Sequence, residues 1–175
     1  MPDSTPEPRW LDETEKHAWL ALARLLVRMP ALLSAQLQQD SSMTHFEYTV
    51  LSCLSEAEEH TLRMSDLAQL ADGSLSRLSQ VVTKLENRGW VTRQRNRQDR
   101  RAIMATLTPE GMTVLVEAAP GHVRAVRQLV IDPLSPEQLG HLREVCETIM
   151  SAAEGNDQWF PGRDHDHEST SPRTP

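Results

Sequence analysis

The spacing of apolar residues changes from helical to strand-like and back again near the middle of this chain. Residues 75–88 carry an apolar side chain every three or four positions, which predicts a helix. Gly89 follows as a left-handed C-cap, and the runs WVTRQR and AIMATL (90–95 and 102–107) then alternate as strands do. A chain with this pattern places a small β-hairpin among helices.

Capping residues mark the starts of the other helices. Thr44 and Glu47 have the spacing of a capping box, in which each side chain satisfies a backbone N–H at the helix start. The stretch DLAQLAD is expected to form a short helix that ends at Gly73. Further N-caps are expected at Ser65, Ser74, Thr108 and Ser135.

Both ends of the chain predict long helices. Apolar residues recur at helical spacing over 10–39, where Pro30 should bend the helix. Residues 109–153 should form two helices, one from Pro109, which Pro120–Gly121 should interrupt, and one from Pro136. Residues 1–9 are expected to form a flexible arm. Residues 154–175 are expected to form a disordered tail, whose alternating Asp and His residues favour solvation over a metal site.

Positive charge is concentrated in the stretch RQRNRQDRR, in which five of nine residues are arginine. Residues 63–107 hold nine Lys or Arg against four Asp or Glu, a charge of +5, although the chain of 175 residues has a net charge of −7. The remainder therefore carries −12. This distribution favours a polyanion bound at one face and repelled elsewhere over a merely solvated arginine run, because like charges this close repel one another.

The predicted order is four helices, a hairpin and two helices. Two short helices joined by a tight turn, a helix with a polar face and a basic hairpin make up a winged helix-turn-helix. We therefore predict a mainly α-helical fold with a small β-hairpin wing. The winged helix-turn-helix should span about 44–107, and helices from both termini should form a dimerisation region.

The helix over 75–88 has one apolar and one polar face. The core-facing residues are expected to be Leu78, Val81, Val82 and Leu85, so the polar side chains point outwards, where they can contact base edges and phosphates. A solvated polar face is the alternative for this helix taken alone. The candidate DNA-binding residues here are Ser74, Ser76, Arg77, Gln80, Thr83 and Lys84.

The stretch LENRGWVTRQRNRQDRRAIMATLTPEG resembles the signature of the MarR family of bacterial transcription regulators. The matching features are the Gly-Trp-Val start of the wing, Asp99 and Arg101 at its tip, the second strand, and the Leu-Thr-Pro-Glu-Gly that leads into the next helix. The resemblance covers about residues 10–153. It implies an obligate homodimer that binds double-stranded DNA at a pseudo-palindromic operator, commonly as a repressor.

The resemblance also implies roles for the wing. In each subunit the fourth helix would enter a major groove and the wing would reach a flanking minor groove, with Arg101 inserted there and oriented by Asp99. Arg97 and Arg100 would contact phosphates, and Arg95 completes the candidate set. Because the minor groove distinguishes mainly A·T from G·C, sequence choice would come from Ser76, Arg77 and Gln80.

The helix faces predict a dimer independently of this resemblance. The long helices over 10–39 and 109–153 have more apolar surface than one small winged helix covers, and isologous pairing would bury it. Packing of the three helices within one chain is the alternative.

A small-molecule effector is a further implication of the resemblance. Trp19, His45 and Tyr48 are the candidate ligand-binding residues, because they combine aromatic surface with hydrogen-bonding groups. The alternative for each is a packed helix junction with a satisfied side chain.

Other classes of protein lack support in this sequence. It has no Gly-rich phosphate loop, nucleophile elbow or zinc pattern, so we expect neither an enzyme nor a cofactor or metal. Cys53 and Cys146 fit no metal or redox spacing and are expected to be buried thiols. No apolar run approaches the ~20 residues that span a bilayer, and no signal peptide pattern is present, so a cytoplasmic location without membrane contact is expected. A winged module that docks an acidic protein partner remains the alternative.

Overall fold

The computed structural model describes residues 7–96, 99 and 101–154. Most of the expected arm and the whole of the expected tail beyond Glu154 lie outside the described residues, as do Arg97 and Arg100. The chain divides into two compact units, residues 1–127 and 128–175.

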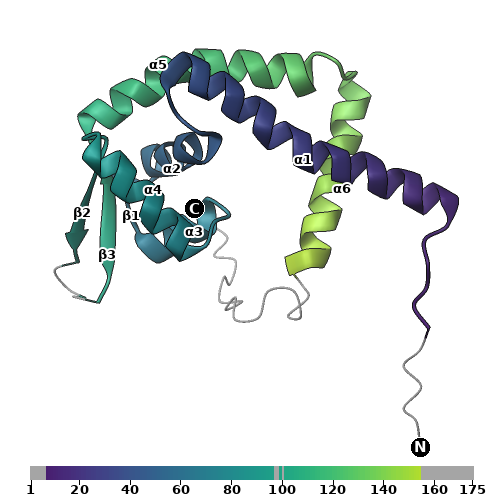
Figure 1. Ribbon diagram of the computed structural model, residues 1–175, viewed down its shortest axis with the longest axis horizontal. Coiled ribbons are helices and arrows are strands. Elements are labelled where there is room, and N and C mark those ends of the chain that lie inside the picture. Colours follow the sequence, from purple (N-terminus) through teal and green to yellow (C-terminus); the bar gives the residue numbers. More distant parts are fainter. Residues whose placement is uncertain (1–6, 97–98, 100, 155–175) are drawn as a thin grey trace, which may run out of the picture. The chain divides into compact units, whose positions relative to one another are not determined.

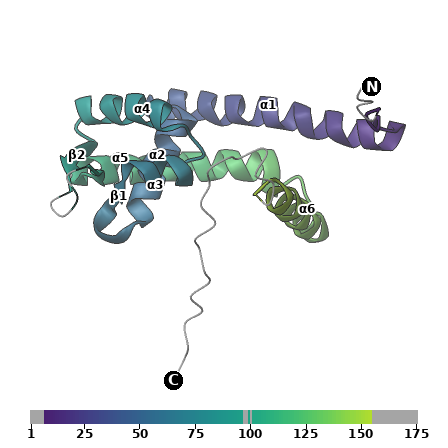
Figure 2. The same ribbon diagram turned by 90° about the horizontal axis from the view of Figure 1, so that it is seen from below.

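The first unit contains the helices of a winged helix-turn-helix and two helices that pack with it. α5 (Pro109–Val126) runs alongside the C-terminal part of α1 (Glu13–Ser41), and α2 (His45–Glu56) packs against both (Figures 1 and 2). The mainly helical fold is confirmed, as is the predicted order of the six helices and the two hairpin strands. The helices are α1 (Glu13–Ser41), α2 (His45–Glu56), the 3-10 turn η1 (Glu58–His60), α3 (Met64–Leu70), α4 (Leu75–Asn87) and α5 (Pro109–Val126).

A three-stranded antiparallel sheet replaces the two-stranded hairpin that the sequence predicted. The hairpin strands are β2 (Val91–Arg95) and β3 (Ile103–Leu107), and the additional strand is β1 (Thr61–Arg63), in the order β1-β3-β2. Thr61 pairs with Thr106, and their hydroxyl oxygens lie 2.9 Å apart. β1 was missed because three residues are too few to show the alternation of a strand.

The core lies between the helices of this unit and one face of the sheet. Its members share nearly complete burial, from 0% to 7% exposed. They come from the end of α1, the turn that follows it, α2 to α5, and β2 and β3. The apolar side chains that are removed from water completely are Leu37, Met43, Val50, Leu51, Leu54, Leu67, Leu78, Val82, Leu85 and Ala105.

Local capping explains most of the helix boundaries. Thr44 and Glu47 form the predicted capping box of α2, Ser74 caps α4, and Gly89 ends α4 with a φ of +77°. The cap predicted at Ser65 is wrong, because the Ser65 hydroxyl donates to Asp66 Oδ1 at 2.8 Å and Arg63 occupies the N-cap position of α3.

Neither proline interrupts its helix. α1 continues through Pro30, and α5 continues through Pro120 to Val126, so the interruption predicted at Pro120–Gly121 is wrong. An interior proline removes one backbone donor and crowds the preceding turn, yet both helices continue beyond it. Gly121 also lies directly against Gln36 and Asp40 of α1, which holds this part of α5 in position.

The second unit contains α6 (Pro136–Glu154), which follows the π-helical turn η2 (Arg127–Ile131). Ser135 and Gln138 form the predicted cap: Gln138 N–H donates to Ser135 Oγ at 3.2 Å, and Ser135 N–H donates to Gln138 Oε1 at 2.9 Å. Cys146 on α6 is exposed, so its predicted burial is wrong for the chain alone. Cys53 on α2 is half-buried, and burial raises the pKa of its thiol.

α1 is more apolar than the sequence analysis allowed. By length and composition alone, an 18-residue stretch of this helix is apolar enough to cross a membrane. Large apolar side chains on it are exposed in the single chain, among them Leu26 at 60% and Val27 at 77%. An apolar helix that pairs with another protein surface has the same composition as a membrane span.

A glycine at the start of α5 joins this helix to the wing. Thr108 Oγ1 donates to Gly89 O at 2.7 Å and accepts from Gly111 N–H at 3.0 Å, so the first turn of α5 lies directly against the end of α4. A Cβ added at Gly111 would lie 2.2 Å from the backbone oxygen of Trp90 and 2.8 Å from Leu107 Cδ1. The Gly of the Thr-Pro-Glu-Gly stretch is therefore required by close packing.

Gly111→Ala should destabilise the protein. The new methyl group meets a backbone atom that can move only with the wing, and overpacking of this kind costs about 1–3 kcal/mol. This outweighs the ~1 kcal/mol by which Ala exceeds Gly in helix propensity. Urea unfolding at fixed protein concentration measures the change. Gly140→Ala in α6 is the control, because a Cβ there has nothing within 4 Å; equal stability of both variants would contradict the packing role of Gly111.

Candidate nucleic-acid interface

α4 presents three distinct stripes along its length. Leu78, Val82 and Leu85 are fully buried in the core, as predicted, whereas Val81 is only partly buried. Ser76, Gln80 and Thr83 form an exposed polar stripe, since they are spaced i, i+4 and i+7. Arg77, Val81 and Lys84 have the same spacing and form a third stripe, which the contacts of Arg77 and Lys84 place beside α2.

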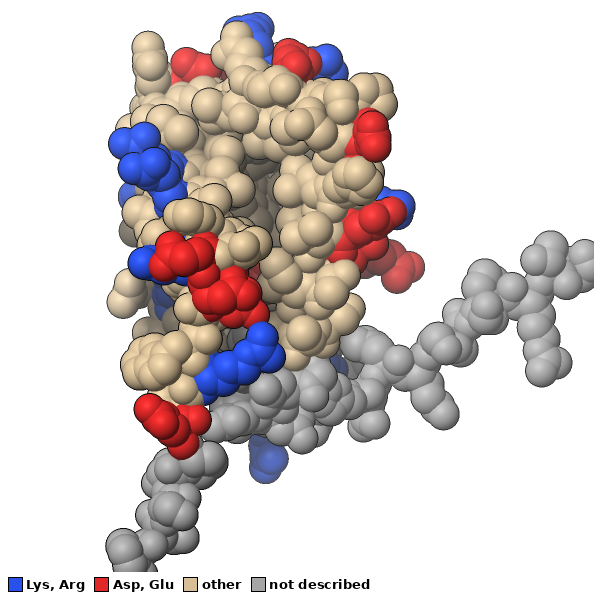
Figure 3. All heavy atoms as spheres, turned by 90° about the vertical axis from the view of Figure 1, so that its right-hand side faces the viewer, with Lys and Arg blue, Asp and Glu red and all other residues tan. Residues whose placement is uncertain are grey.

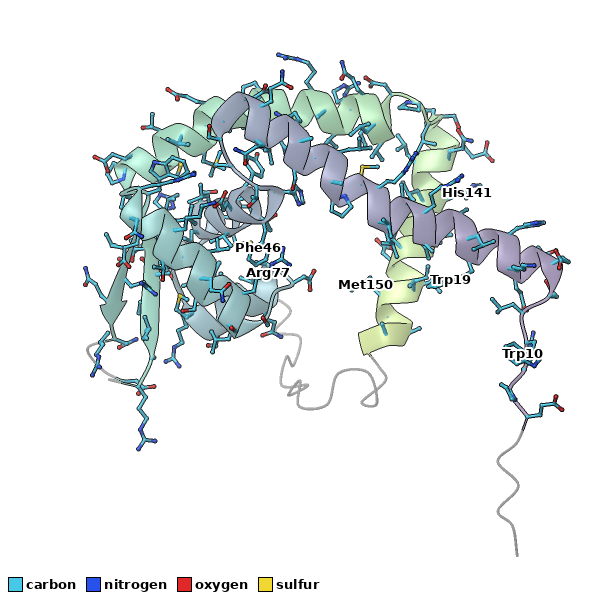
Figure 4. All side chains as sticks on the ribbon, viewed as in Figure 1. Trp10, Trp19, Phe46, Arg77, His141 and Met150 are labelled. Atoms are coloured by element: carbon cyan, nitrogen blue, oxygen red, sulfur yellow. The ribbon has the colours of Figure 1, made fainter. Side chains whose placement is uncertain are left out.

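Arg77 is stacked on an aromatic ring of α2. Its guanidinium carbon lies 4.0 Å from the centre of the Phe46 ring, and the two side chains point toward one another in Figure 4. Gly73, in the turn between α3 and α4, allows this ring to approach, because a Cβ there would lie 2.6 Å from Phe46 Cζ. The stacking holds the first turn of α4 against α2 while the Arg77 side chain stays exposed.

Two further candidates on α4 have partners inside the protein. The Lys84 ammonium lies 2.7 Å from Oε1 of the buried Glu47. The Thr83 hydroxyl donates to the Ser79 carbonyl at 2.8 Å, which leaves its oxygen able to accept. The sequence placed both side chains on the polar face, but a helical pattern does not show which polar residues have internal partners.

Two arginines within the positively charged residues 63–107 are held by the protein itself. Arg93 on β2 donates to Glu86 Oε2 through Nη2 at 2.6 Å and through Nε at 3.0 Å. These hydrogen bonds lower the pKa of the Glu86 carboxyl. Arg88 donates to the Ser42 carbonyl at 3.0 Å and stacks 4.8 Å over Trp90. Not every arginine here therefore needs an external anion, which corrects the expectation that only an anion relieves their repulsion.

The tip of the wing is shaped by Asp99. Its Oδ1 accepts from the backbone N–H of Arg101 at 3.0 Å, and its carbonyl accepts from Ala102 N–H at 2.9 Å. Asp99 N–H donates in turn to Asn96 Oδ1 at 3.3 Å. The carboxylate thus fixes the backbone that carries the exposed Arg101. Arg95 is exposed at the end of β2.

A hollow of about 290 Å³ separates α4 from the wing. It brings three arginines together from β1, β2 and the wing tip: Arg63, Arg93 and Arg101. Sequence reasoning did not include Arg63 among the candidates, because β1 was not predicted and its place beside the wing depends on pairing with β3. Met64, Ser65, Leu75, Ser79, Ala102 and Ile103 complete the lining.

The candidate effector residues do not all come together. His45 and Tyr48 on α2 lie beside His122 of α5, with ring centres 5.7 Å and 4.4 Å from that of His122. Trp19 is 54% exposed on the N-terminal half of α1 and lies away from α2 (Figure 4). It is fifteen residues from Ser34, the residue of α1 that accepts from His45 N–H, which is roughly 22 Å along a helix.

The cluster beside α5 contains polar atoms without a protein partner. Among the described residues, the buried atoms that lack one are His122 Nδ1 and Gln36 Oε1. Gln36 Nε2 donates to Asp40 Oδ2 at 2.8 Å. Burial lowers the pKa of His45, and burial together with the charge of His45 lowers the pKa of His122. His122 was missed because only the packing of α5 on α2 places it beside His45. Gln36 was missed because only the packing of α5 on α1 places it beside Gly121, the neighbour of His122.

The fold and the stripes of α4 define a winged helix-turn-helix protein. The MarR family model matches residues 43–103. Sco3205 of Streptomyces coelicolor, a MarR family regulator solved in complex with DNA, is 41% identical, with a TM-score of 0.82 over 86% of this chain and 94% of that one. AbsC from the same organism is 37% identical, with a TM-score of 0.80 over 85% of this chain and 100% of that one. The chain belongs to the MarR family, and this confirms the resemblance.

More distant curated relatives match over a shorter stretch. The transcriptional repressor MprA of Escherichia coli is 26% identical over 111 residues, which are 63% of this chain and 62% of MprA. The chain thus spans about three fifths of the length of this relative. These relatives are transcriptional regulators, in agreement with the expectation that the chain is not an enzyme.

Acidification should destabilise the protein through the cluster around His122. The pKa values of His45 and His122 are lowered from 6.5 in the folded chain, so between those lowered values and 6.5 the unfolded chain binds more protons. The stability contribution is complete above pH 6.5 and is lost as the pH falls through the folded pKa values. We expect His122→Gln to lose less stability than the wild type between pH 7.5 and 5.5, measured by urea unfolding.

The control is His17→Gln, which changes an exposed histidine on α1. It should keep the pH dependence of the wild type. If His122→Gln and the wild type lost stability in parallel, burial of this histidine would not account for the pH dependence.

Proposed function

We propose that this chain is a homodimeric transcription regulator of the cytoplasm that binds a pseudo-palindromic DNA site and represses until a small-molecule effector releases it. The observation that carries this proposal is the exposed polar stripe of α4 beside a wing that bears exposed arginines. Sco3205, a family member of the same fold, was solved in complex with DNA, and MprA is a repressor; both support the proposal.

In this proposal α4 reads bases in the major groove. The N-terminus of α4, which Ser74 caps, carries a partial positive charge that faces the duplex. Ser76 and Gln80 face the base edges, and Arg77 reaches a guanine from its place beside Phe46. Thr83 accepts a hydrogen bond further along the same stripe, because its hydroxyl hydrogen is donated to Ser79.

The wing contacts the DNA beside that groove. Arg101 enters the minor groove, where a narrow A·T-rich groove attracts a guanidinium, and Asp99 fixes the backbone that carries it. Arg95, Arg97 and Arg100 contact phosphates, and Arg63 joins them from β1. On the face shown in Figure 3, by contrast, acidic as well as basic side chains occur among uncharged ones, as expected of a surface that binds no polyanion.

A second copy of the chain covers the exposed apolar surfaces of the long helices. A surface helix that leaves so many large apolar side chains in water is stabilised when another surface buries them. In an isologous pair the same apolar surface of both copies is buried in one interface. The exposed residues are Trp19, Leu20, Leu25, Leu26, Val27 and Leu32 on α1, and Val145, Ile149 and Met150 on α6.

The effector binds beside His45, Tyr48 and His122. Gln36 Oε1 and His122 Nδ1 are buried without a hydrogen-bond partner in the protein, so a ligand can supply one. The cluster joins α2, which holds α4, to α5, so a ligand there acts on the position of α4. Trp19 contributes to the dimer surface in this proposal rather than to the effector site.

Fluorescence anisotropy with a duplex from the region upstream of the protein's own gene tests DNA binding. A scrambled duplex of equal composition is titrated in parallel at several salt concentrations. The proposal requires tighter binding to the upstream duplex and affinity that falls by about 0.9 log units per log salt for each phosphate contact. If no duplex bound at low salt, the proposal would fail and an acidic protein would become the partner of the wing.

Arg77→Ala should weaken binding to the preferred site by about 1–3 kcal/mol and relax the preference for one base pair. The reason is the loss of a bidentate contact to guanine, and anisotropy against single base-pair variants of the site measures it. The control, Arg143→Ala on α6, removes the same charge elsewhere and should change neither the affinity for the preferred site nor the base-pair preference. A loss that was equal on all sequences would reduce Arg77 to a phosphate contact.

Arg101→Ala should weaken binding most on sites with A·T-rich flanks. Removal of the guanidinium from a narrow minor groove takes away the attraction that such flanks strengthen. Replacing the flanks by G·C pairs should then reduce wild-type affinity more than that of the variant. Equal affinity of the variant and the wild type at low salt, on both kinds of flank, would contradict this role.

A further inference from the structure

Glu47 is the charged side chain that the fold buries most completely among the described residues, at 1% exposed. Each of its carboxylate oxygens has a separate partner. Oε2 accepts from Thr44 N–H at 2.7 Å within the capping box of α2, and Oε1 lies 2.7 Å from the ammonium of Lys84 on α4. One carboxylate therefore ties the start of α2 to the last turns of α4.

A buried carboxylate destabilises a protein unless it is paired and hydrogen-bonded. Burial by itself raises the pKa of Glu47, whereas the hydrogen bonds from Lys84 and Thr44 and the charge of Lys84 lower it, and the result is a lowered pKa. Glu47 therefore stays ionised where it is buried, and Lys84 is the cation that keeps it so.

The ion pair of Glu47 with Lys84 is one of two contacts that adjacent residues of α2 make with α4. Phe46 stacks on Arg77, and the adjacent Glu47 binds Lys84, seven residues further along α4. Seven residues are about two helical turns, so both contacts lie on one side of α4. They leave the stripe of Ser76, Gln80 and Thr83 exposed beside them.

We propose that Lys84 is a positioning residue for DNA binding: by holding Glu47, it fixes α4 on α2 at the angle that presents the polar stripe, and it neutralises no phosphate. This inference rests on the proposed DNA-binding function. It differs from the expectation, drawn from sequence alone, that Lys84 contacts the DNA directly.

Three variants distinguish positioning from phosphate contact. Lys84→Met removes the ammonium and leaves the Glu47 charge buried without it. Glu47→Gln removes that charge, and its amide oxygen can still accept from Thr44 N–H. The double variant Glu47→Gln/Lys84→Met has the net charge of the wild type. Lys16→Met, on α1 and 55% exposed, is the control for loss of one lysine charge.

The measurements are urea unfolding at fixed protein concentration and anisotropy titrations on one duplex at several salt concentrations. We expect Lys84→Met to be less stable and to bind DNA about ten-fold more weakly, a coupling typical of residues in contact. We expect the double variant to recover most of both losses. The salt dependence should stay that of the wild type in every variant, and Lys16→Met should match the wild type throughout.

Other outcomes would overturn the proposal. A phosphate contact would lower the salt slope by about 0.9 in both Lys84→Met and the double variant, with no recovery of affinity. A purely structural bridge would lower the stability of Lys84→Met but leave the DNA affinity of the folded variant unchanged. If the wild type bound no duplex at all, the proposed function itself would fail, and the stability measurements would still show whether Glu47 and Lys84 are coupled.

Discussion

The burial of one apolar stripe of α4 determines what the rest of this molecule can do. Leu78, Val82 and Leu85 are completely removed from water. Each such burial stabilises the fold by about 1.5–3 kcal/mol. Because a helix is rigid, turning one stripe into the core turns the opposite one outwards. The polar stripe of α4 is exposed for this reason, and the wing, α2 and α5 are arranged around the same core.

Charged side chains on α2, α4 and the wing divide into two groups with different physical roles. Glu47 with Lys84, and Glu86 with Arg93, are pairs that tie α4 to α2 and to the wing. Arg95 and Arg101 are exposed on the wing and are suited to an external anion. The first group stabilises the platform on which the second group is displayed. An acidic chain can therefore bind a polyanion at one place without attracting it over its whole surface.

The cluster of His45, Tyr48 and His122 connects α5 to α2, the helix that contacts α4. It lies where α5 packs on α2, and the neighbouring residues of α2 contact Arg77 and Lys84. In the proposed function, a ligand or a proton at this cluster would act first on the packing of α2 and α5. A change in the position of α2 would then reach α4 through the contacts of Phe46 and Glu47.

Sequence by itself determined the features of this protein that depend on near neighbours. Caps at Thr44, Ser74 and Thr108, the left-handed Gly89 and the two wing strands all follow from residues within a few positions of one another. The buried and exposed faces of α4 follow from a period of 3.6 residues. The family was also recognisable, because its signature lies in one continuous stretch of the chain.

Tertiary structure decided whatever depends on residues far apart in the chain. β1 exists because Thr61 pairs with Thr106, and Arg63 lies beside the wing only through that pairing. His122 replaces Trp19 as the neighbour of His45 because α5, rather than the N-terminal half of α1, lies there. Lys84 and Arg77 looked alike in sequence as outward polar residues. Only the packing of α2 on α4 gives one a carboxylate and the other an aromatic ring, since burial and pairing are properties of the folded chain.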